Sequence, residues 1–329
     1  MKVQRITQPG GPEVLALEER PEPEPGPGEL RVRVRASALN RADLLQIRGF
    51  YPPPQDVPAD VPGLEYAGEV EAVGPRTRRF KVGDRVMGLV GGGAWAESLI
   101  THEREALPMP EGMSFTDAAA LPEAYLTAYD ALVLQGELRP GETVLIHAVA
   151  SGVGSAAAQL CSASGARVVG TGRSAAKLAR ASEWGVARTV LCDSSPPAFA
   201  DAVRAETGGR GADLCLDLVG GDYVPETLNA LAPRGRVILV GLVAGTSTEL
   251  NLGTVLVKRL RVTGTVLRSR PLEEKIALSQ SAERHLLPLF LSGALKPVVD
   301  AVVPMSQLRQ ALERMERNDS VGKLVVRWE

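Results

Sequence analysis

A short turn of small residues, Ser151-Gly152-Val153-Gly154, follows an apolar run at residues 143–146 that is typical of a buried strand. The Ala-rich segment 155–160 that comes next has high helical propensity. A strand, a glycine turn and a helix in this order are typical of nucleotide-binding proteins, because a pyrophosphate binds free N–H groups at the positive end of the helix dipole. We therefore expect Gly152 and Gly154 to leave a pyrophosphate room near the backbone.

The turn by itself is an incomplete motif, so its cofactor is inferred from the strand at residues 166–171. Val149 and Ser151 stand where the G-x-G-x-x-G pattern has two of its glycines. NAD-binding sites place Asp or Glu about 20 residues beyond the turn, and this strand ends without an acidic residue. Two cations and a hydroxyl follow it, which suit a 2′-phosphate: Arg173, Ser174 and Lys177. We therefore expect the cofactor to be NADPH. The alternative is that Arg173 and Lys177 are solvent-exposed residues at the start of a helix. We favour the phosphate site, because basic residues at a helix N-terminus oppose the helix dipole unless an anion balances them.

Length and composition narrow the class of protein. At 329 residues, with 44% hydrophobic residues, the chain is long enough for two domains. The formal net charge of −2 gives no overall basic surface, so a nucleic-acid partner is not expected. No apolar run reaches membrane-spanning length, and Met1–Ile6 has the pattern of a strand rather than of a signal peptide. We expect a cytoplasmic protein without membrane association.

The residue types that bind metals or form disulfides are few and scattered. Three cysteines without C-x-x-C spacing and three histidines far apart make up the set: Cys161, Cys192, Cys215, His102, His147 and His285. We expect the thiols to be reduced and packed. Because Zn²⁺ needs thiolate or imidazole ligands in tetrahedral number, no metal site is expected. His147 is predicted to be a strand-end residue beside the glycine turn rather than a ligand.

Residues up to Gly112 have the pattern of a β-rich domain, with short alternating strands between Pro and Gly residues. Strands are expected at residues 29–36, 66–73 and 85–90. A short helix between the first two runs into a proline-stiffened loop that carries Phe50 and Tyr51. Loops on a rigid scaffold commonly hold ligands. We nevertheless expect Phe50 to be a hydrophobic anchor for the loop.

From Thr116 the pattern becomes helical and then alternates strands with helices, which predicts a doubly wound parallel sheet. Its six strands are expected at residues 143–146, 166–171, 188–191, 212–219, 235–241 and 260–264. The ligand should bind at their carboxyl ends. Beyond the sheet we expect an amphipathic helix over 272–291 and two strands, 299–303 and 322–327, that complete the β domain begun by the N-terminus.

Five motifs, in order over nearly the whole chain, resemble those of a known family: Asn40-Arg41-Ala42-Asp43, Gly63-Leu64-Glu65, residues 121–128, residues 147–154 and Leu267-Arg268-Ser269-Arg270. The chain resembles the medium-chain dehydrogenase/reductases, specifically the zinc-independent quinone oxidoreductases of the zeta-crystallin type, and among these most of all the tumour-suppressor-inducible quinone oxidoreductase of vertebrates. This resemblance implies an α/β fold in which a six-stranded Rossmann domain at 121–265 binds NADPH. A GroES-like catalytic domain would be formed by residues 1–120 and completed by residues 266–329.

The resemblance also implies which residues contact NADPH: Asn40, Tyr51, Thr127, Ser151, Gly152, Val153, Gly154, Arg173, Ser174, Lys177, Gly241, Leu242, Leu267, Arg268, Ser269 and Asn318. Tyr51 would hydrogen-bond a substrate carbonyl oxygen, while Asn40 and Thr127 would orient the nicotinamide carboxamide. Ser151 would be either a site hydroxyl near the nicotinamide or a small turn residue. Two positions depart from the family pattern. Arg173 replaces what is often a small residue, which could strengthen phosphate binding, and Cys192 replaces a tyrosine against the adenosine half, which puts that contact in doubt.

Zinc-dependent relatives carry a Cys near Asn40, a His in place of Leu64 and a four-Cys lobe, none of which is present. The chemistry would then be that of the cofactor, and the protein would position the cofactor and the substrate. Quinones suit a site without a metal, since the aromatic ring stabilises the hydroquinone oxyanion. The sequence therefore predicts an NADPH:quinone oxidoreductase.

Two other functions stay open. An NADPH-dependent alkenal or enone reductase needs the same hydride geometry. A non-catalytic protein is the other possibility, either crystallin-like or an NADPH-dependent nucleic-acid binder. The family resemblance also implies that the protein is a homodimer, formed through the edge strand at 260–262.

Overall fold

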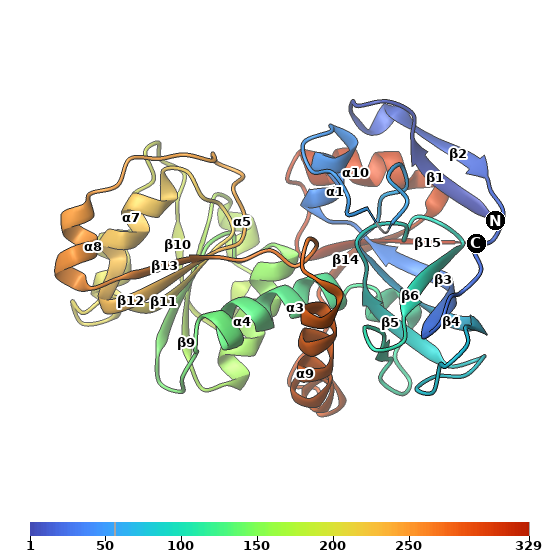
Figure 1. Cartoon of the computed structure of the whole chain (residues 1–329). Coiled ribbons are helices and arrows are strands. Elements are labelled where there is room, and N and C mark those ends of the chain that lie inside the picture. Colours follow the sequence, from blue (N-terminus) through green and yellow to red (C-terminus); the bar gives the residue numbers. More distant parts are fainter. Residues whose placement is uncertain (56, 329) are drawn as a thin grey trace. The chain divides into compact units, whose positions relative to one another are not determined.

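The fold is that of a computed structural model, which describes residues 1–55 and 57–328. The chain divides into two compact units (Figure 1). Unit 1 contains Met1–Leu126 together with the chain from Leu267 to the C-terminus, and unit 2 contains Thr127–Val266. Among the described residues, no helix is both long enough and apolar enough to cross a membrane.

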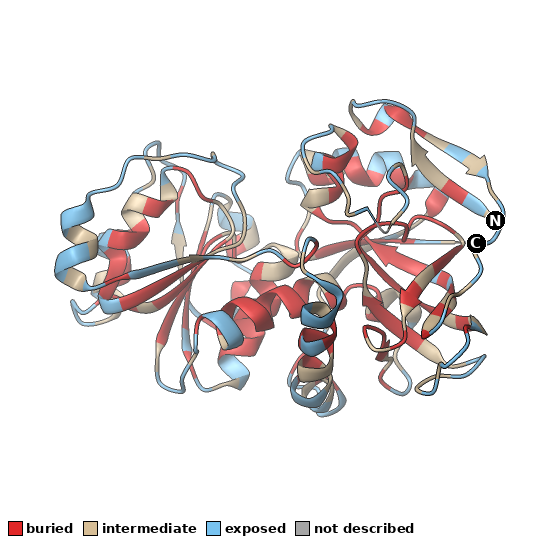
Figure 2. Cartoon of the chain, in the orientation of Figure 1, coloured by how far each residue is buried: buried red, intermediate tan, exposed pale blue. Residues whose placement is uncertain are grey.

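Unit 2 is built on a six-stranded parallel sheet, as the sequence predicts. In spatial order its strands are β10 (Val186–Leu191), β9 (Arg167–Gly172), β8 (Thr143–Ile146), β11 (Ala212–Asp217), β12 (Leu231–Leu239) and β13 (Arg261–Gly264). All four residues of β8 are buried, because a parallel strand in the middle of such a sheet is covered on both faces. Figure 2 shows the buried residues concentrated along these strands.

The helices of unit 2 alternate with its strands: α4 (Gly152–Ala163), α5 (Ala175–Leu178), α6 (Ala200–Glu206), α7 (Tyr223–Ala230) and α8 (Leu252–Lys258). α4 begins where the small-residue turn ends. Its Ala-rich sequence lets it lie close to the sheet, and its residues 154–161 are buried. The parallel strands all end at one edge of the sheet, so the segments that follow β8, β9 and β12 are neighbours there.

Unit 1 is built on a mixed sheet of order β14-β15-β3-β4-β5-β7, with β6 also paired to β3. These strands are β3 (Glu29–Ala38), β4 (Glu65–Val73), β5 (Arg85–Leu89), β6 (Ser98–His102), β7 (Leu107–Pro108), β14 (Val299–Pro304) and β15 (Lys323–Arg327). β15 runs antiparallel to β3, with Val326 opposite Ser37. The two terminal strands therefore complete the sheet that the N-terminal segment begins, as expected.

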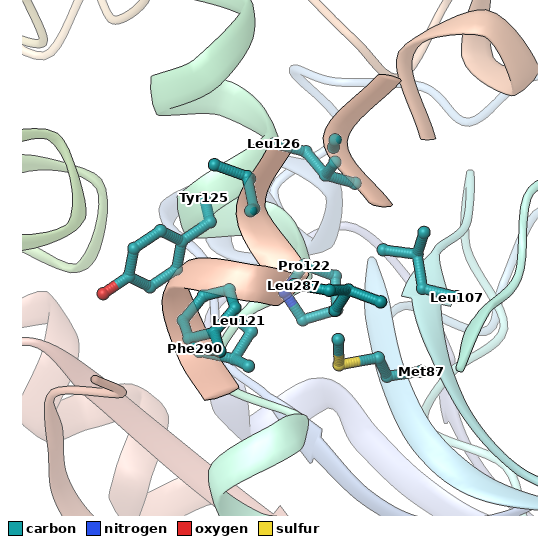
Figure 3. Close-up of a pocket in the computed structure, with 10 residues that line it drawn as sticks. Met87, Leu107, Leu121, Pro122, Tyr125, Leu126, Leu287 and Phe290 are labelled. Atoms are coloured by element: carbon teal, nitrogen blue, oxygen red, sulfur yellow. The ribbon is translucent and has the colours of Figure 1, made fainter. Parts of the chain in front are cut away.

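A two-stranded sheet and five helices surround this sheet: β1 (Lys2–Ile6) with β2 (Leu15–Glu19), and α1 (Arg41–Ile47), α2 (Phe115–Ala118), α3 (Pro122–Tyr129), α9 (Leu272–Leu291) and α10 (Leu308–Glu316). α9 has the predicted bounds. It packs against the first turn of α3, where the Tyr125 and Phe290 rings meet edge to face at 4.8 Å (Figure 3). The apolar cavity there has a volume of about 20 Å³, which is about the space of one water. It is therefore a packing defect rather than a substrate site.

The expected anchor role of Phe50 is wrong, because its side chain is 77% exposed. Gly49 adopts a left-handed conformation (φ 81°) that turns the chain at the end of α1. The Phe50 N–H still donates to the Leu45 carbonyl at 2.9 Å. The loop is held instead by Tyr51, whose ring and carbonyl both contact Arg268.

Candidate functional site

The small-residue turn of unit 2 forms the N-terminus of α4. Ser151 is the N-cap, and its Oγ accepts the Gly154 N–H at 3.1 Å. The N–H groups of Gly152 and Val153 have no acceptor within residues 1–55 and 57–328, as is usual in a first helical turn. The half-buried segment 151–153 therefore offers free donors at the positive end of a twelve-residue helix.

Gly154 is required by the protein itself. A Cβ atom built on it would lie 2.4 Å from the Ala148 carbonyl oxygen and 2.8 Å from the Val149 Cα. Both atoms belong to the turn itself. Gly154 is therefore needed to close the turn, in addition to any room that a phosphate requires.

His147 follows β8 and is fully buried. Its Nδ1 lies 2.9 Å from Thr171 Oγ1 on β9, and its Nε2 lies 2.8 Å from Thr227 Oγ1 on α7. Burial lowers the pKa of His147 to about 4, although nearby Asp217 acts in the opposite direction. The neutral ring thus ties two strands to a helix, in agreement with the expected strand-end role and not with metal ligation.

The three residues expected to hold a 2′-phosphate follow β9. Arg173 is exposed and forms no ion pair within the part of the chain that the structure describes. Ser174 is the N-cap of α5, and its Oγ accepts the Lys177 N–H at 3.4 Å. No carboxylate occurs between Gly172 and Lys177. The surface after β9 therefore presents a cation and a hydroxyl, which is the donor set that a phosphate requires.

Cys192 lies after β10 and is buried, and the structure contains it, Cys161 and Cys215 as free, buried thiols. This confirms the expected state of the cysteines. Burial chiefly, and the neighbouring Cys192 thiol next, raise the pKa of Tyr223. The expected contact residues Gly241 and Leu242 lie just after β12. The Gly241 N–H is 3.3 Å from the Asp217 carbonyl oxygen, and the Leu242 side chain is 50% exposed.

In unit 1, Asn40 starts α1 and lies in a buried polar network. The Asn40 N–H donates to Asp43 Oδ2 at 2.7 Å, and its side-chain amide donates to Glu65 Oε1 at 2.9 Å. Its Oδ1 accepts from Lys323 Nζ at 2.5 Å. The amide of Asn40 is thus fixed in orientation by partners from β4 and β15.

Arg268 is buried and positions Tyr51. Its Nη1 donates to the Tyr51 carbonyl at 3.0 Å, its Nη2 to Gln46 Oε1 at 2.5 Å and its Nε to the Gly91 carbonyl at 2.7 Å. The guanidinium carbon also lies 4.8 Å from the centre of the Tyr51 ring. Burial raises the pKa of the Tyr51 hydroxyl, and Glu123 adds to this effect.

The remaining predicted residues are dispersed. Thr127 is buried in α3, Leu267 is buried, and Ser269 is exposed. Asn318 has a left-handed backbone (φ 56°), and its Oδ1 accepts from Arg41 Nη2 at 2.7 Å. Within unit 1, the structure thus holds Asn40 among Asp43, Glu65 and Lys323 and brings Tyr51 into contact with Arg268. It places the segments 151–154, 173–177 and 241–242 at one edge of the sheet of unit 2.

Three charged residues of the unit 1 network had no predicted role: Glu65, Glu123 and Lys323. Glu65 and Glu123 lie inside two of the family motifs, and these positions could have predicted a role for both residues. Lys323 had no signal except that it is a charged residue at the start of an apolar strand. Within residues 1–55 and 57–328, no group of three or more His, Cys, Asp or Glu side chains is arranged to hold a metal ion.

Two family patterns match most of the chain. Residues 26–111 match the alcohol dehydrogenase GroES-like domain, and residues 152–283 match the zinc-binding dehydrogenase family. The quinone oxidoreductase of Pseudomonas aeruginosa is 40% identical over 320 residues, which cover 96% of each chain. The synaptic vesicle membrane protein VAT-1 homolog of Danio rerio is 33% identical over 306 residues, but this chain spans only 62% of its length.

Solved structures show the same fold. The quinone oxidoreductase of Pseudomonas syringae superposes with a TM-score of 0.88 at 33% identity and 99% coverage of both chains. A mycobacterial protein solved in complex with NADPH superposes with a TM-score of 0.87 at 28% identity, again with 99% coverage of both chains.

Proposed function

The chain belongs to the medium-chain dehydrogenase/reductase and quinone oxidoreductase family, an oxidoreductase family that uses nicotinamide cofactors, and from this premise we propose that it reduces quinones with NADPH and without a metal. The observation that carries the quinone assignment is the likeness to the P. aeruginosa quinone oxidoreductase along nearly all of both chains. Within the family, we propose the tumour-suppressor-inducible quinone oxidoreductase as the nearest type. Residues 121–265 are the proposed NADPH-binding domain, and residues 1–120 with 266–329 the proposed catalytic domain.

The donor set of unit 2 fits NADPH. The free N–H groups of Gly152 and Val153 suit the pyrophosphate, and the hydroxyl of Ser151 remains able to donate a hydrogen bond. Exposed Arg173, with Ser174 and Lys177, suits the 2′-phosphate, since a strand end without a carboxylate offers nothing to repel it. We assign Gly241 and Leu242 to the same ligand, because β12 ends at the same edge of the sheet.

In unit 1, the proposed roles follow from what holds each side chain. Bound NADPH supplies the hydride. Tyr51, held by Arg268, donates a hydrogen bond to the substrate carbonyl oxygen, while Asn40 orients the nicotinamide carboxamide. Thr127, the first residue of unit 2, is proposed to orient the same carboxamide. Because Glu65 and Lys323 fix the Asn40 side chain, Asn40 is preorganised for this task.

Metal independence is supported by the residues themselves. Leu64, at the position where zinc-dependent relatives carry a histidine, is 3% exposed and packed in the apolar interior. Elemental analysis of the purified protein should find no stoichiometric zinc, and chelators should leave its activity intact. One tightly held zinc per chain would overturn this part of the proposal.

A steady-state screen tests the activity. Ortho- and para-quinones are compared with enals and enones, each with NADPH and with NADH. We expect quinone turnover with a preference for NADPH. A preference for enals would assign the alkenal or enone reductase activity instead, and tight NADPH binding with no turnover would indicate a binding protein.

We also propose a homodimer formed through the β13 edge. β13 is the last strand of the sheet, and its Val262 is 41% exposed. The neighbouring helix α8 has no buried residue: Leu252, Leu256 and Val257 are 73%, 78% and 77% exposed (Figure 2). Aliphatic side chains exposed in such a group beside an open sheet edge suit a second copy of the chain.

A further inference from the structure

The Lys323 ammonium group determines which way the Asn40 side-chain amide is turned. Its Nζ lies 2.6 Å from Glu65 Oε1, 2.5 Å from Asn40 Oδ1 and 3.0 Å from the Leu39 carbonyl oxygen, and these contacts use its three hydrogens. An ammonium group donates hydrogen bonds and accepts none. The Asn40 atom that faces Lys323 is therefore the amide oxygen, because an amide nitrogen there would set hydrogens against hydrogens.

Glu65 requires the same orientation of the amide. Its Oε1 accepts from Lys323 and, at 2.9 Å, from Asn40 Nδ2, and its Oε2 accepts the Glu123 N–H at 2.8 Å. These three donors stabilise the charged form of a carboxyl that is 0% exposed. A carboxylate accepts hydrogen bonds and donates none. The reversed amide would face Glu65 with its oxygen and Lys323 with its NH2 group, and would lose both hydrogen bonds.

Asn40 has no side-chain hydrogen left for a ligand. Its Nδ2 donates to Glu65 and, at 3.3 Å, to the Ala38 carbonyl oxygen. Although Asn40 is the N-cap of α1, its side chain makes no cap hydrogen bond, and the Asp43 N–H donates to the Asn40 carbonyl oxygen at 3.0 Å. An amide oxygen has two lone pairs, and Lys323 uses one of them on Oδ1. Asn40 can therefore meet a ligand only as an acceptor.

Resting on the proposed function, in which Asn40 orients the nicotinamide carboxamide, we propose that Lys323 is a positioning residue that sets the direction of this hydrogen bond. The carboxamide NH2 group donates to Asn40 Oδ1, and the carboxamide oxygen receives nothing from Asn40. Asn40 is 8% exposed, so an acceptor left without a donor by a different ligand is costly there. Asn40 and Lys323 together thus select cofactors that carry the NH2 group.

Cofactor analogues test this direction in the wild-type protein. The 3-acetylpyridine analogue of NADP⁺ keeps the carbonyl oxygen but has a methyl group in place of NH2. The thionicotinamide analogue keeps NH2 but has sulfur, a weak acceptor, in place of the oxygen. Calorimetric titration gives the dissociation constant of each. We expect the acetylpyridine analogue to bind about tenfold more weakly than NADP⁺ and the thionicotinamide analogue to bind about as well as NADP⁺. The reverse order, or equal binding of all three, would overturn the proposal.

A double variant assigns the direction to Lys323. Lys323→Met with Glu65→Gln replaces the ion pair by neutral side chains and leaves no buried charge without its partner. The Asn40 amide is then able to turn and donate to the carbonyl oxygen that the acetylpyridine analogue retains. We expect the preference for NADP⁺ over this analogue to be largely lost. A merely structural role of the pair would weaken the binding of both cofactors alike and leave their ratio unchanged, which would overturn the role of Lys323.

Two further variants complete the test, and thermal unfolding shows that each variant is folded. Asn40→Leu removes the acceptor and should also abolish the preference, whether or not the Lys323 and Glu65 double variant folds. Arg236→Met with Glu142→Gln is the matched control, because it removes another enclosed ion pair, whose side chains are 11% and 16% exposed in unit 2. It should keep the tenfold preference. Loss of the preference in this control as well would overturn the role of Lys323.

The outcomes separate this inference from the proposed function. If the wild-type protein binds the cofactors in the expected order but reduces no quinone, the proposed activity fails and the direction of the Asn40 hydrogen bond stands. If it reduces quinones with NADPH but binds the two analogues in the reverse order, the proposed function stands and the inference fails. If it binds neither NADP⁺ nor NADPH, both are overturned.

Discussion

Lys323 Nζ lies 2.6 Å from Glu65 Oε1, and the two side chains are 6% and 0% exposed. One belongs to the last strand of the chain and the other starts β4, on opposite sides of β3 in the same sheet. The pair holds the Asn40 amide from two directions. It therefore joins the C-terminal segment to the candidate substrate site of unit 1.

Removing the cation of this pair should be strongly destabilising. Lys323→Met leaves Glu65 charged and buried without its partner, which costs about 3–5 kcal/mol of unfolding free energy. Urea unfolding measures the change. The control is Arg35→Met, which breaks an exposed pair with Glu69 and should cost at most about 1 kcal/mol. Equal, small losses in both variants would show that the buried pair is not ionised.

His147 should make stability depend on pH. Its pKa is about 4 in the folded state, below the ordinary value of 6.5, so the unfolded chain binds the extra proton first. The stabilisation is complete above pH 6.5 and is lost as the pH falls toward 4. His147→Gln leaves one threonine hydroxyl unpaired and should cost about 1–3 kcal/mol at pH 7.

The measurement is urea unfolding of His147→Gln and wild type at pH 7 and pH 5. The difference between them should narrow at pH 5, because only the wild-type protein loses stability on acidification at this site. A difference that grows on acidification would contradict the neutral state of His147.

Cofactor choice should depend on the segment after β9. Replacing Arg173 and Lys177 together by alanine should weaken NADPH binding by about one to several factors of ten, because charge-assisted hydrogen bonds to the 2′-phosphate are lost. NADH, which lacks that phosphate, should bind almost as before. The two dissociation constants are measured at one fixed low salt concentration, since exposed cations are screened.

Arg180→Ala is the matched control, since this cation lies just beyond α5 and pairs with Glu183. It should leave both dissociation constants unchanged. If the double variant weakens NADH and NADPH equally, Arg173 and Lys177 act on the fold or on the pyrophosphate. If neither constant changes, the 2′-phosphate binds elsewhere.

The two glycines of the turn should respond differently to substitution. Gly152→Val should abolish NADPH binding while the protein keeps its thermal stability, because the side chain would stand beside the free N–H donors. Gly154→Ala should instead lower Tm, since its Cβ would lie 2.4 Å from the Ala148 carbonyl oxygen. Calorimetry and cofactor titration separate the two effects. NADPH affinity that survives Gly152→Val would remove the turn from the site.

The apolar face of α8 should be required for dimerisation. Leu256→Glu places a charge on a side chain that is 78% exposed, so the fold should survive and only the association with a second copy should be lost. Light scattering should report a dimer for the wild type and a monomer for the variant. Leu17→Glu, 57% exposed on β2, is the control and should remain dimeric. A monomeric wild type would refute the proposed interface.

Local patterns in the sequence predicted much of the fold. The alternation of apolar runs with helical stretches indicated all six parallel strands, with ends that differ by a few residues, and the amphipathic period of residues 272–291 gave both ends of α9. These features depend on neighbours in the chain, such as side chains that alternate across a strand or recur along a helix face. The small-residue turn and the basic residues after β9 were likewise visible because each is a contiguous segment.

Only the tertiary structure decided which side chains share a site. Tyr51 is held by Arg268, and Asn40 by Lys323, across more than two hundred residues of sequence in each case. The burial that raises the pKa of Glu123 is likewise a property of what surrounds it and not of its own segment. Phe50 was misjudged for the same reason. Its solvent exposure is set by how the rest of the chain packs around the loop, and a local sequence pattern carries no record of that.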